Sequence, residues 1–230
     1  MASPAPSSRE TGSAELPCLV VLRGNSGSGK TTTAHAVRQA YGKHGLAVLS
    51  QDVIRRQVLW EKDRPGAVNV GLIDVMARHI LGQGYHLVLE GILHADHYGP
   101  VLSRLLQDHP GPRHAYYFDL PFQATLARHA TKPAAHEYGE PELRKWWRPR
   151  DLLPGGAEQL IDEHATVDQT VRRILDDCGL PSSAGHPGST GVSQPCDREP
   201  NAHAVGKRQG FAAMLGCEEG GHGSVPLRSS

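Results

Sequence analysis

The chain has 230 residues, which is enough for one α/β domain with a buried core and does not by itself call for a second domain. Its 24 basic and 24 acidic residues balance, so the overall charge argues against a nucleic-acid scaffold and against a membrane-surface protein. No apolar run reaches the roughly 20 residues of a membrane span and no signal peptide is visible, so we expect a cytoplasmic chain. Its four cysteines are widely spaced, and we expect them to be ordinary thiols: Cys18, Cys178, Cys196 and Cys217.

The first predicted elements are a strand, a Gly-rich turn and a helix. Residues 1–14 have too little apolar surface to offset the entropy of ordering them, so we expect a disordered tail there. The apolar run Cys18–Leu22 then predicts a buried strand. A turn leads from it into Lys30–Tyr41, where apolar residues recur at spacings of three and four, which gives a helix one apolar face.

Four more apolar runs, each followed by a helical pattern, continue this alternation. Short buried strands alternating with helices are typical of βαβ units around a parallel sheet that is covered on both faces. The last helix begins with a capping box formed by Thr166 and Gln169. We therefore expect one ordered domain over residues 15–180 and a disordered tail over 181–230. The further strands are predicted at Ala47–Ser50, Leu87–Gly91, Ala115–Asp119 and Gln159–Asp162.

The turn between the first strand and the first helix carries a phosphate-binding motif. It satisfies G-x-x-x-x-G-K-[ST] at every fixed position, and it has the strand before it and the helix after it that this motif requires. The glycines let successive backbone N–H groups point at phosphates, and the helix N-terminus adds the positive end of its dipole. The predicted nucleotide-binding residues are Gly24, Asn25, Ser26, Gly27, Ser28, Gly29, Lys30, Thr31 and Thr32.

The same region predicts how ATP and Mg²⁺ are held. Lys30 is expected to bridge the β- and γ-phosphates, and Thr31 offers a hydroxyl to Mg²⁺, which prefers oxygen ligands. Glu90 ends an apolar run, and a carboxylate at the tip of a buried strand is costly unless it meets water or a metal. We therefore predict Thr31, Asp52 and Glu90 as the magnesium site. The Asn-Lys-x-Asp segment that confers guanine specificity is missing from the sequence, which disfavours a GTPase.

Asp52 and Arg55 are the candidate chemical groups. Asp52 follows the second predicted strand, so in an open α/β sheet it would lie at the carboxyl edge, where ligands bind. Its carboxylate could accept the proton of an attacking hydroxyl while Arg55 holds the acceptor side. The structural alternative is that Asp52 caps a helix and that Arg55 is solvated.

A locally basic segment, residues 128–150, stands out in an otherwise neutral chain. A flap that carries several cations could close over a triphosphate and stabilise the charge that develops during transfer, and a solvated basic helix is the alternative. Trp146 and Trp147 in this segment could pack on the domain or stack on a substrate. The cations that could contact the transferring phosphate are Arg128, Lys132 and Arg148.

These elements and motifs together resemble the small-molecule kinase branch of the P-loop proteins. This branch contains adenylate kinase, shikimate kinase, chloramphenicol phosphotransferase, zeta toxins and the kinase half of phage polynucleotide kinase. The similarity covers about residues 17–178, and the stretch Arg148–Pro154 is similar to one in bacterial AAA-type proteins labelled only as kinases. It implies a three-layer α/β/α P-loop NTPase fold, with a five-stranded parallel sheet in the order 2-3-1-4-5 and a helical lid at about residues 128–150.

The resemblance also implies roles for single residues. Asp52-x-x-Arg55 resembles an element of the polynucleotide and antibiotic kinases in which the Asp is the general base and the Arg binds the substrate side. The run from Asp119 to Lys132 is similar to the one that enters the adenylate kinase lid, where a first cation stacks on adenine and a second contacts phosphate. Those cations correspond to Arg128 and Lys132, and Lys132 stands where that family has Arg.

The expected function is ATP- and Mg²⁺-dependent transfer of a phosphoryl group to a hydroxyl of a small molecule. The acceptor would be a metabolite, a sugar nucleotide or an antibiotic. One alternative is a polynucleotide 5′-hydroxyl kinase, which should also show a continuous basic groove for a strand's backbone. Another is an ATP-binding regulatory protein that changes shape without phosphorylating anything.

Overall fold

A computed structural model describes residues 16–130 and 139–183. Within these ranges the chain forms five strands, and each lies within one or two residues of its predicted position. The predicted N-terminal tail lies outside the described residues, as does the predicted C-terminal tail apart from residues 181–183. The strands are β1 (Leu19–Gly24), β2 (Leu46–Ser50), β3 (His86–Glu90), β4 (Arg113–Phe118) and β5 (Glu158–Ile161).

The strands form one parallel sheet in the order β2-β3-β1-β4-β5, which confirms the predicted topology. All six residues of the central strand β1 are buried, as expected for a strand covered on both faces. In the register of the sheet, Glu90 at the end of β3 lies between Leu22 of β1 and Ser50 of β2. The carboxyl ends of these three strands are therefore adjacent.

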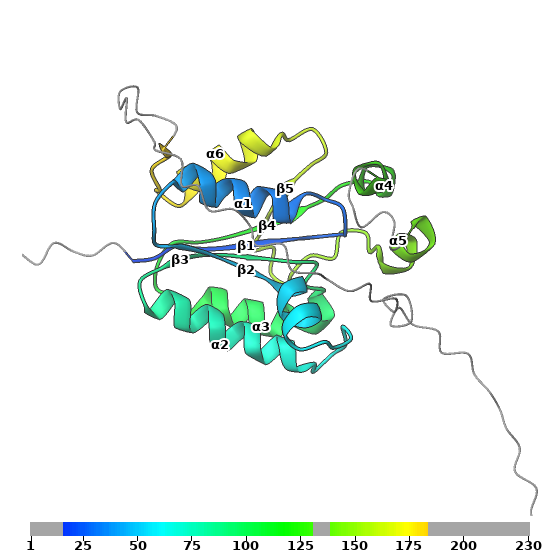
Figure 1. Cartoon of the computed structure of the whole chain (residues 1–230), viewed down its shortest axis with the longest axis horizontal. Coiled ribbons are helices and arrows are strands. Elements are labelled where there is room, and N and C mark those ends of the chain that lie inside the picture. The colour runs from blue at the N-terminus through cyan, green and yellow to red at the C-terminus, as the bar shows by residue number, and fades with distance from the viewer. Residues whose placement is uncertain (1–15, 131–138, 184–230) are drawn as a thin grey trace, which may run out of the picture. The chain divides into compact units, whose positions relative to one another are not determined.

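Helices cover both faces of the sheet (Figure 1). The helices α1 and α6 lie on one face, α2 and α3 on the other, and α4 and α5 lie beyond one end of the sheet. The whole of α5 and the last residues of α4 fall in the range predicted as a lid. Across the described ranges, no helix is both long and apolar enough to cross a membrane. The helical segments are α1 (Lys30–Tyr41), the π-helical η1 (Val53–Val58), α2 (Val68–Gly82), α3 (Ala95–Asp108), α4 (Phe122–Ala130), α5 (Glu140–Trp146) and α6 (Val167–Asp177).

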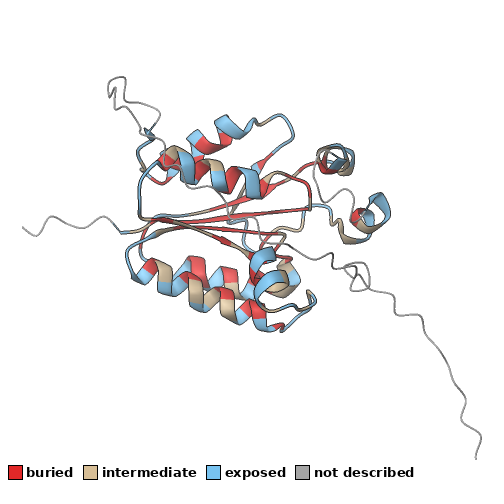
Figure 2. Cartoon of the chain, viewed as in Figure 1, coloured by how far each residue is buried: buried red, intermediate tan, exposed pale blue. Residues whose placement is uncertain are grey.

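Two hydrophobic clusters form the core, one on each face of the sheet. Successive side chains of a strand point to opposite faces, so Leu19 and Val21 pack with α2 and α3, whereas Val20 and Leu22 pack with α1 and α6. Figure 2 shows the result: the strands are largely buried, and each helix carries both buried and exposed residues. The core thus fixes the sheet whose carboxyl edge carries the candidate site.

The final helix begins as the sequence predicts. The backbone N–H of Gln169 donates to Oγ1 of Thr166, and the backbone N–H of Thr166 donates to Oε1 of Gln169, which makes the predicted capping box. Val171 and Ile174 on this helix are buried against the sheet.

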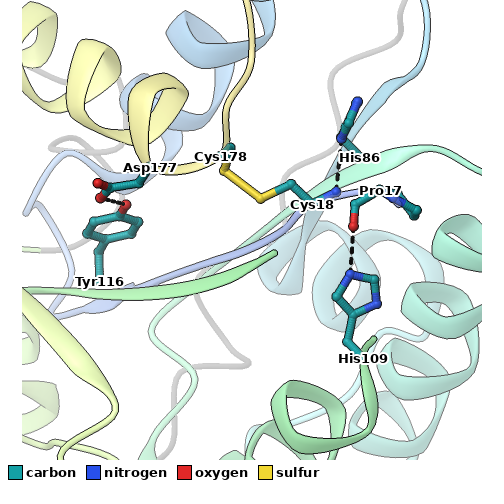
Figure 3. Close-up of a disulfide and its surroundings, with 7 residues drawn as sticks. All are labelled: Pro17, Cys18, His86, His109, Tyr116, Asp177 and Cys178. Atoms are coloured by element: carbon teal, nitrogen blue, oxygen red, sulfur yellow. Dashed lines mark hydrogen bonds between the residues drawn. A yellow bond between two sulfur atoms is a disulfide. The ribbon is translucent and has the colours of Figure 1, made fainter. Parts of the chain in front are cut away.

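Cys18 and Cys178, predicted to be ordinary thiols, form a disulfide (Figure 3). Their Cα atoms are 5.9 Å apart, a normal separation for this bond. Cys18 immediately precedes β1 and Cys178 immediately follows α6, so the two lie 160 positions apart in the chain and no local pattern indicates that they meet. The prediction is therefore wrong for this pair. Cys196 and Cys217 lie outside the described residues.

Candidate functional site

Most of the predicted site residues lie at the carboxyl edge of the sheet. The phosphate loop follows β1, Asp52 follows β2, and Glu90 is the last residue of β3. Because β3 pairs with both β1 and β2 in parallel register, the loops that leave these strands emerge side by side. This is the edge at which open α/β sheets bind their ligands.

The loop between β1 and α1 surrounds the amino group of Lys30. The Lys30 side chain is buried, and its Nζ donates to the carbonyl oxygen of Asn25 at 2.8 Å and to Oγ of Ser28 at 3.1 Å. The N-cap residue of α1 is Gly29, which has no side chain to cap the first turn, so the positive end of the helix dipole faces the loop. Backbone donors and one ammonium group at a helix N-terminus are a typical phosphate site.

The close approach of Gly27 to α4 predicts a measurable effect of adding a side chain. Gly27 has φ +81°, and a Cβ there would lie 2.6 Å from the carbonyl oxygen of Thr125. Gly84 also has φ +81° but would have nothing within 4 Å of its Cβ, so it is a matched control. For Gly84→Ala the left-handed conformation alone should cost about 1–2 kcal/mol of unfolding free energy. We expect Gly27→Ala to cost more and also to weaken ATP binding, because the loop must move away from Thr125.

Urea unfolding of both variants and ATP titration by calorimetry measure these effects. Equal losses of stability, with ATP affinity unchanged in both, would show that the contact with Thr125 does not constrain the phosphate loop.

Thr31 and Glu90 form the pair best suited to a hard cation. Oγ1 of Thr31 donates to Oε2 of Glu90 at 3.0 Å, and Glu90 is 2% exposed. A buried carboxylate needs a compensating donor or metal, and Mg²⁺ takes oxygen ligands of this kind. The two residues therefore fit a magnesium site next to the phosphate loop.

Asp52 makes different contacts from those of the other two predicted metal ligands. Its Oδ1 accepts from Nη2 of Arg55 at 3.0 Å and lies 3.4 Å from Nε of Arg56. Among the described residues, its side-chain bonds go to these arginines rather than to Thr31 or Glu90. Asp52 is the N-cap residue of η1, but its side chain makes no capping hydrogen bond and is about half exposed, so the carboxylate is accessible to a substrate. The sequence analysis did not single out Arg56.

Arg128 lies between the phosphate loop and a segment that the sequence analysis missed. Its Nη1 donates to the carbonyl oxygen of Ser28 at 2.9 Å, and its Nη2 donates to that of Glu163 at 3.4 Å. Beside it is a pocket of about 460 Å³, a typical volume for a small-molecule site. The missed segment is residues 161–167. Asp162 is the sequence signal that could have indicated it, because a polar residue directly after a strand of a parallel sheet lies at the ligand-binding edge. The pocket is lined by Gly27, Ser28, Gly29, Thr32, Thr33, Phe118, Arg128, residues 161–167 and Thr170.

The side chain of Asn25 joins the phosphate loop to the segment that follows α5. Its Nδ2 donates to the carbonyl oxygen of Arg148 at 2.7 Å, and its Oδ1 accepts from the backbone N–H of Arg148 at 2.9 Å. The guanidinium of Arg148 pairs with Asp96 of α3 at 2.9 Å. Arg148 thus lies beside the loop, with its charge paired to an acidic side chain. Lys132 lies outside the described residues.

The helix of the predicted lid, α5, and the residue after it contact α4 through a cationic and an aromatic interaction. Trp147 meets Phe122 edge to face with the ring centroids 5.9 Å apart, and the guanidinium of Arg144 lies over the same Phe122 ring at 4.4 Å. Trp147 therefore packs on the domain, which is one of the two alternatives that the sequence left open.

A buried arginine fixes the segment that follows Arg148. Arg23 of β1 is fully buried, and it pairs with Glu158 at 2.8 Å and with Asp151 at 3.2 Å. Burial alone would raise the pKa of Asp151, but the His94 imidazole 3.5 Å away, the hydrogen bond from the Ala95 amide and the charge of Arg23 hold that pKa below its ordinary value. The sequence analysis missed this network, although a charged residue inside an apolar strand requires a partner.

Comparisons with known proteins agree with this geometry. The family described as AAA domain matches residues 19–146. APS kinase CysC of Mycobacterium tuberculosis, solved with AMPPNP and APS, is 17% identical with a TM-score of 0.54, and the match covers 71% of this chain and 98% of that one. The Deinococcus radiodurans tunicamycin resistance protein is 16% identical with a TM-score of 0.53, covering 72% and 98%. A gluconokinase from Sinorhizobium meliloti 1021 is 15% identical with a TM-score of 0.51, covering 72% and 93%.

At these identities the solved structures show a shared fold, which is that of the P-loop kinases. The comparison with curated protein sequences gave no match. The chemistry of the chain must therefore be argued from its own residues.

Proposed function

The chain belongs to the AAA domain family, and from this premise we propose that it is an ATP- and Mg²⁺-dependent kinase that phosphorylates a hydroxyl of a small molecule. The acceptor is a metabolite, a sugar nucleotide or an antibiotic. One observation carries the proposal: the phosphate loop, the Thr31–Glu90 pair and the Asp52–Arg55 pair lie at one edge of the sheet. Two of the three compared structures are kinases by name, which supports a phosphotransferase.

The proposed nucleotide site extends from the phosphate loop into the adjoining pocket. Residues 24–32 bind the phosphates through backbone N–H groups, and Lys30 neutralises the β- and γ-phosphates. The 460 Å³ pocket beside the loop has room for the remainder of ATP. Arg128 lines that pocket and contacts both the loop and Glu163, a position suited to contact with the adenine ring of ATP.

The donor set also fits magnesium. Thr31 and Glu90 would hold Mg²⁺ directly or through its waters, and Asp52 on the neighbouring strand end would contribute from the acceptor side. When bound, Mg²⁺ would neutralise the negative charge that develops on the phosphate oxygens.

On the acceptor side, Asp52 is the proposed general base. As the acceptor hydroxyl oxygen forms its bond to the γ-phosphorus of ATP, its proton passes to the Asp52 carboxylate, and the bond to ADP breaks. Arg55 keeps this carboxylate in place at 3.0 Å and offers its charge to the acceptor. Nearby, Gln51 donates to the Tyr98 hydroxyl, and its buried Oε1 accepts no bond from any described residue. Such polar surroundings suit an acceptor rich in hydroxyl groups.

The cations of the lid would complete the site. Arg128, Lys132 and Arg148 are proposed to stabilise negative charge on the transferring group. The backbone of Arg148 is already held beside the phosphate loop by Asn25, so its guanidinium needs only to exchange Asp96 for a phosphate oxygen.

The test uses γ-labelled ATP, Mg²⁺, the full chain and a fractionated cell extract, with a short 5′-hydroxyl oligonucleotide in a parallel reaction. Label in a small molecule that mass spectrometry identifies is the expected result. Label on the oligonucleotide would instead make the chain a polynucleotide kinase. ATP binding without transfer to any acceptor would overturn the proposal in favour of a regulatory protein.

A further inference from the structure

Three side chains that can bind metals meet on one face of the sheet, at the end where the strands begin. Cys18 lies directly before β1 and Cys178 directly after α6 (Figure 3), and His114 is the second residue of β4. His114 pairs in register with Val20 of β1. Side chains of paired residues, and of residues two apart on a strand, share a face of the sheet, so His114 and Cys18 both face α6. The phosphate loop is at the other end of β1.

The spacing of the three ligand atoms is compatible with one metal ion. The two sulfur atoms and an imidazole nitrogen of His114 all lie within 4.8 Å of one another. Tetrahedral ligands about 2.3 Å from zinc lie about 3.8 Å apart, so small side-chain movements suffice once the sulfurs separate. Two thiolates with one imidazole favour a thiophilic ion such as Zn²⁺ over Mg²⁺ or Ca²⁺.

His114 is better suited to be the third ligand than the other two histidines nearby. His86 accepts the backbone N–H of Cys18 through Nδ1, and Nε2 of His109 is hydrogen-bonded to the carbonyl oxygen of Pro17 (Figure 3). Among the described residues, His114 makes a ring contact with Tyr116 but no side-chain hydrogen bond. The His114 imidazole lies close to both cysteine sulfurs and has a ligand nitrogen to offer.

We propose that, when the disulfide is reduced, Cys18, Cys178 and His114 bind one zinc-type metal ion. The inference stands apart from the proposed kinase activity. A dithiol reductant supplies two electrons and two protons to the disulfide, which gives two cysteine thiols and leaves the reductant as a disulfide. Each thiol then releases its proton to solvent as it binds the metal, and water takes the fourth position. In the oxidised protein the two sulfurs join β1 to α6 through a covalent bond. In the reduced, metal-bound protein they would join the same elements through the metal.

Zinc and cobalt binding to the full chain test the proposal. Cys196 and Cys217 are first replaced by serine so that they contribute no ligand. The reduced protein should bind one Zn²⁺ per chain after desalting, measured by elemental analysis, and the oxidised protein should bind none. Co²⁺ added to the reduced protein should give the thiolate charge-transfer and tetrahedral visible bands of a two-sulfur site.

The His114→Gln variant separates a metal site from a simple disulfide. It leaves both cysteines in place, and its oxidised form should melt as the parent does. Loss of one ligand should nevertheless lower zinc affinity by at least about 10-fold in a chelator competition. His79→Gln, at an exposed position of α2, is the matched control and should keep full affinity. Unchanged affinity in His114→Gln, or zinc absent from the reduced parent, would leave only a structural disulfide and overturn the proposal.

Discussion

The Lys30→Met variant is expected to transfer phosphate about 10²- to 10³-fold more slowly than the wild-type chain while keeping its fold. Lys30 is buried, and its Nζ bonds to Asn25 and Ser28 inside the loop proposed to hold the phosphates. Methionine retains an unbranched side chain in that space but removes the charge that would stabilise the transferring group. Lys30→Ala should lose transfer to a similar degree. The rate of label transfer from γ-labelled ATP and the Tm of each variant are the measurements.

Lys43→Met is the matched control for this experiment. Lys43 is an exposed lysine just after α1, and its Nζ lies 5.0 Å from the centre of the Tyr41 ring. Removing its charge should leave transfer unchanged, since the residue is at the far end of α1 from the phosphate loop. If Lys30→Met keeps wild-type turnover, the loop does not act on the phosphates and the kinase proposal fails.

The fold could be predicted because its signals are local. The apolar run at β1, the motif after it and the periodicity of α1 all lie within residues 18–41, and each restricts the secondary structure of the adjacent segment. The alternation of strands and helices then favours a parallel sheet. The strand order itself came from the resemblance to P-loop kinases, and the register of β1 with β3 and β4 confirms it.

The candidate site was predictable where its residues follow strand ends. Glu90 and Thr31 were predicted to share a metal site, and they are hydrogen-bonded. Asp52 was assigned to the same site, yet its carboxylate pairs with Arg55 and Arg56. Position in the sequence gives the edge of the sheet at which a side chain lies, but it does not give the direction in which that side chain turns.

Two of the contacts that the sequence did not reveal join distant segments. Asn25 bonds to Arg148, which lies 123 positions later, and Arg23 pairs with Glu158, 135 positions later. Neither pair has a spacing that recurs in a motif. Each contact depends on the sheet, which places β4 between β1 and β5, so only the folded structure identifies the partner.

Asp52→Asn is the second substitution with a large expected effect, a fall in the transfer rate of about 10²- to 10⁴-fold if Asp52 is the general base. Asparagine has nearly the same shape, and its amide oxygen can still accept from Nη2 of Arg55, so the local structure should be retained. It cannot take up the proton of the acceptor hydroxyl at neutral pH. Single-turnover transfer to the labelled acceptor should therefore slow, while ATP affinity measured by calorimetry should change little.

Asp74→Asn provides the comparison that makes this result specific. Asp74 on α2 is also a partly exposed carboxylate paired with an arginine on its own helix, Arg78 at 2.9 Å, and its helix packs on the sheet away from the phosphate loop. Each substitution removes one negative charge from a carboxylate that is paired with arginine, so a general effect of that loss should appear in both. A slow Asp52→Asn beside a normal Asp74→Asn locates proton transfer at Asp52. Wild-type rates in both would remove Asp52 from the chemistry, even if Lys30 proved essential, and would favour a different base near the acceptor.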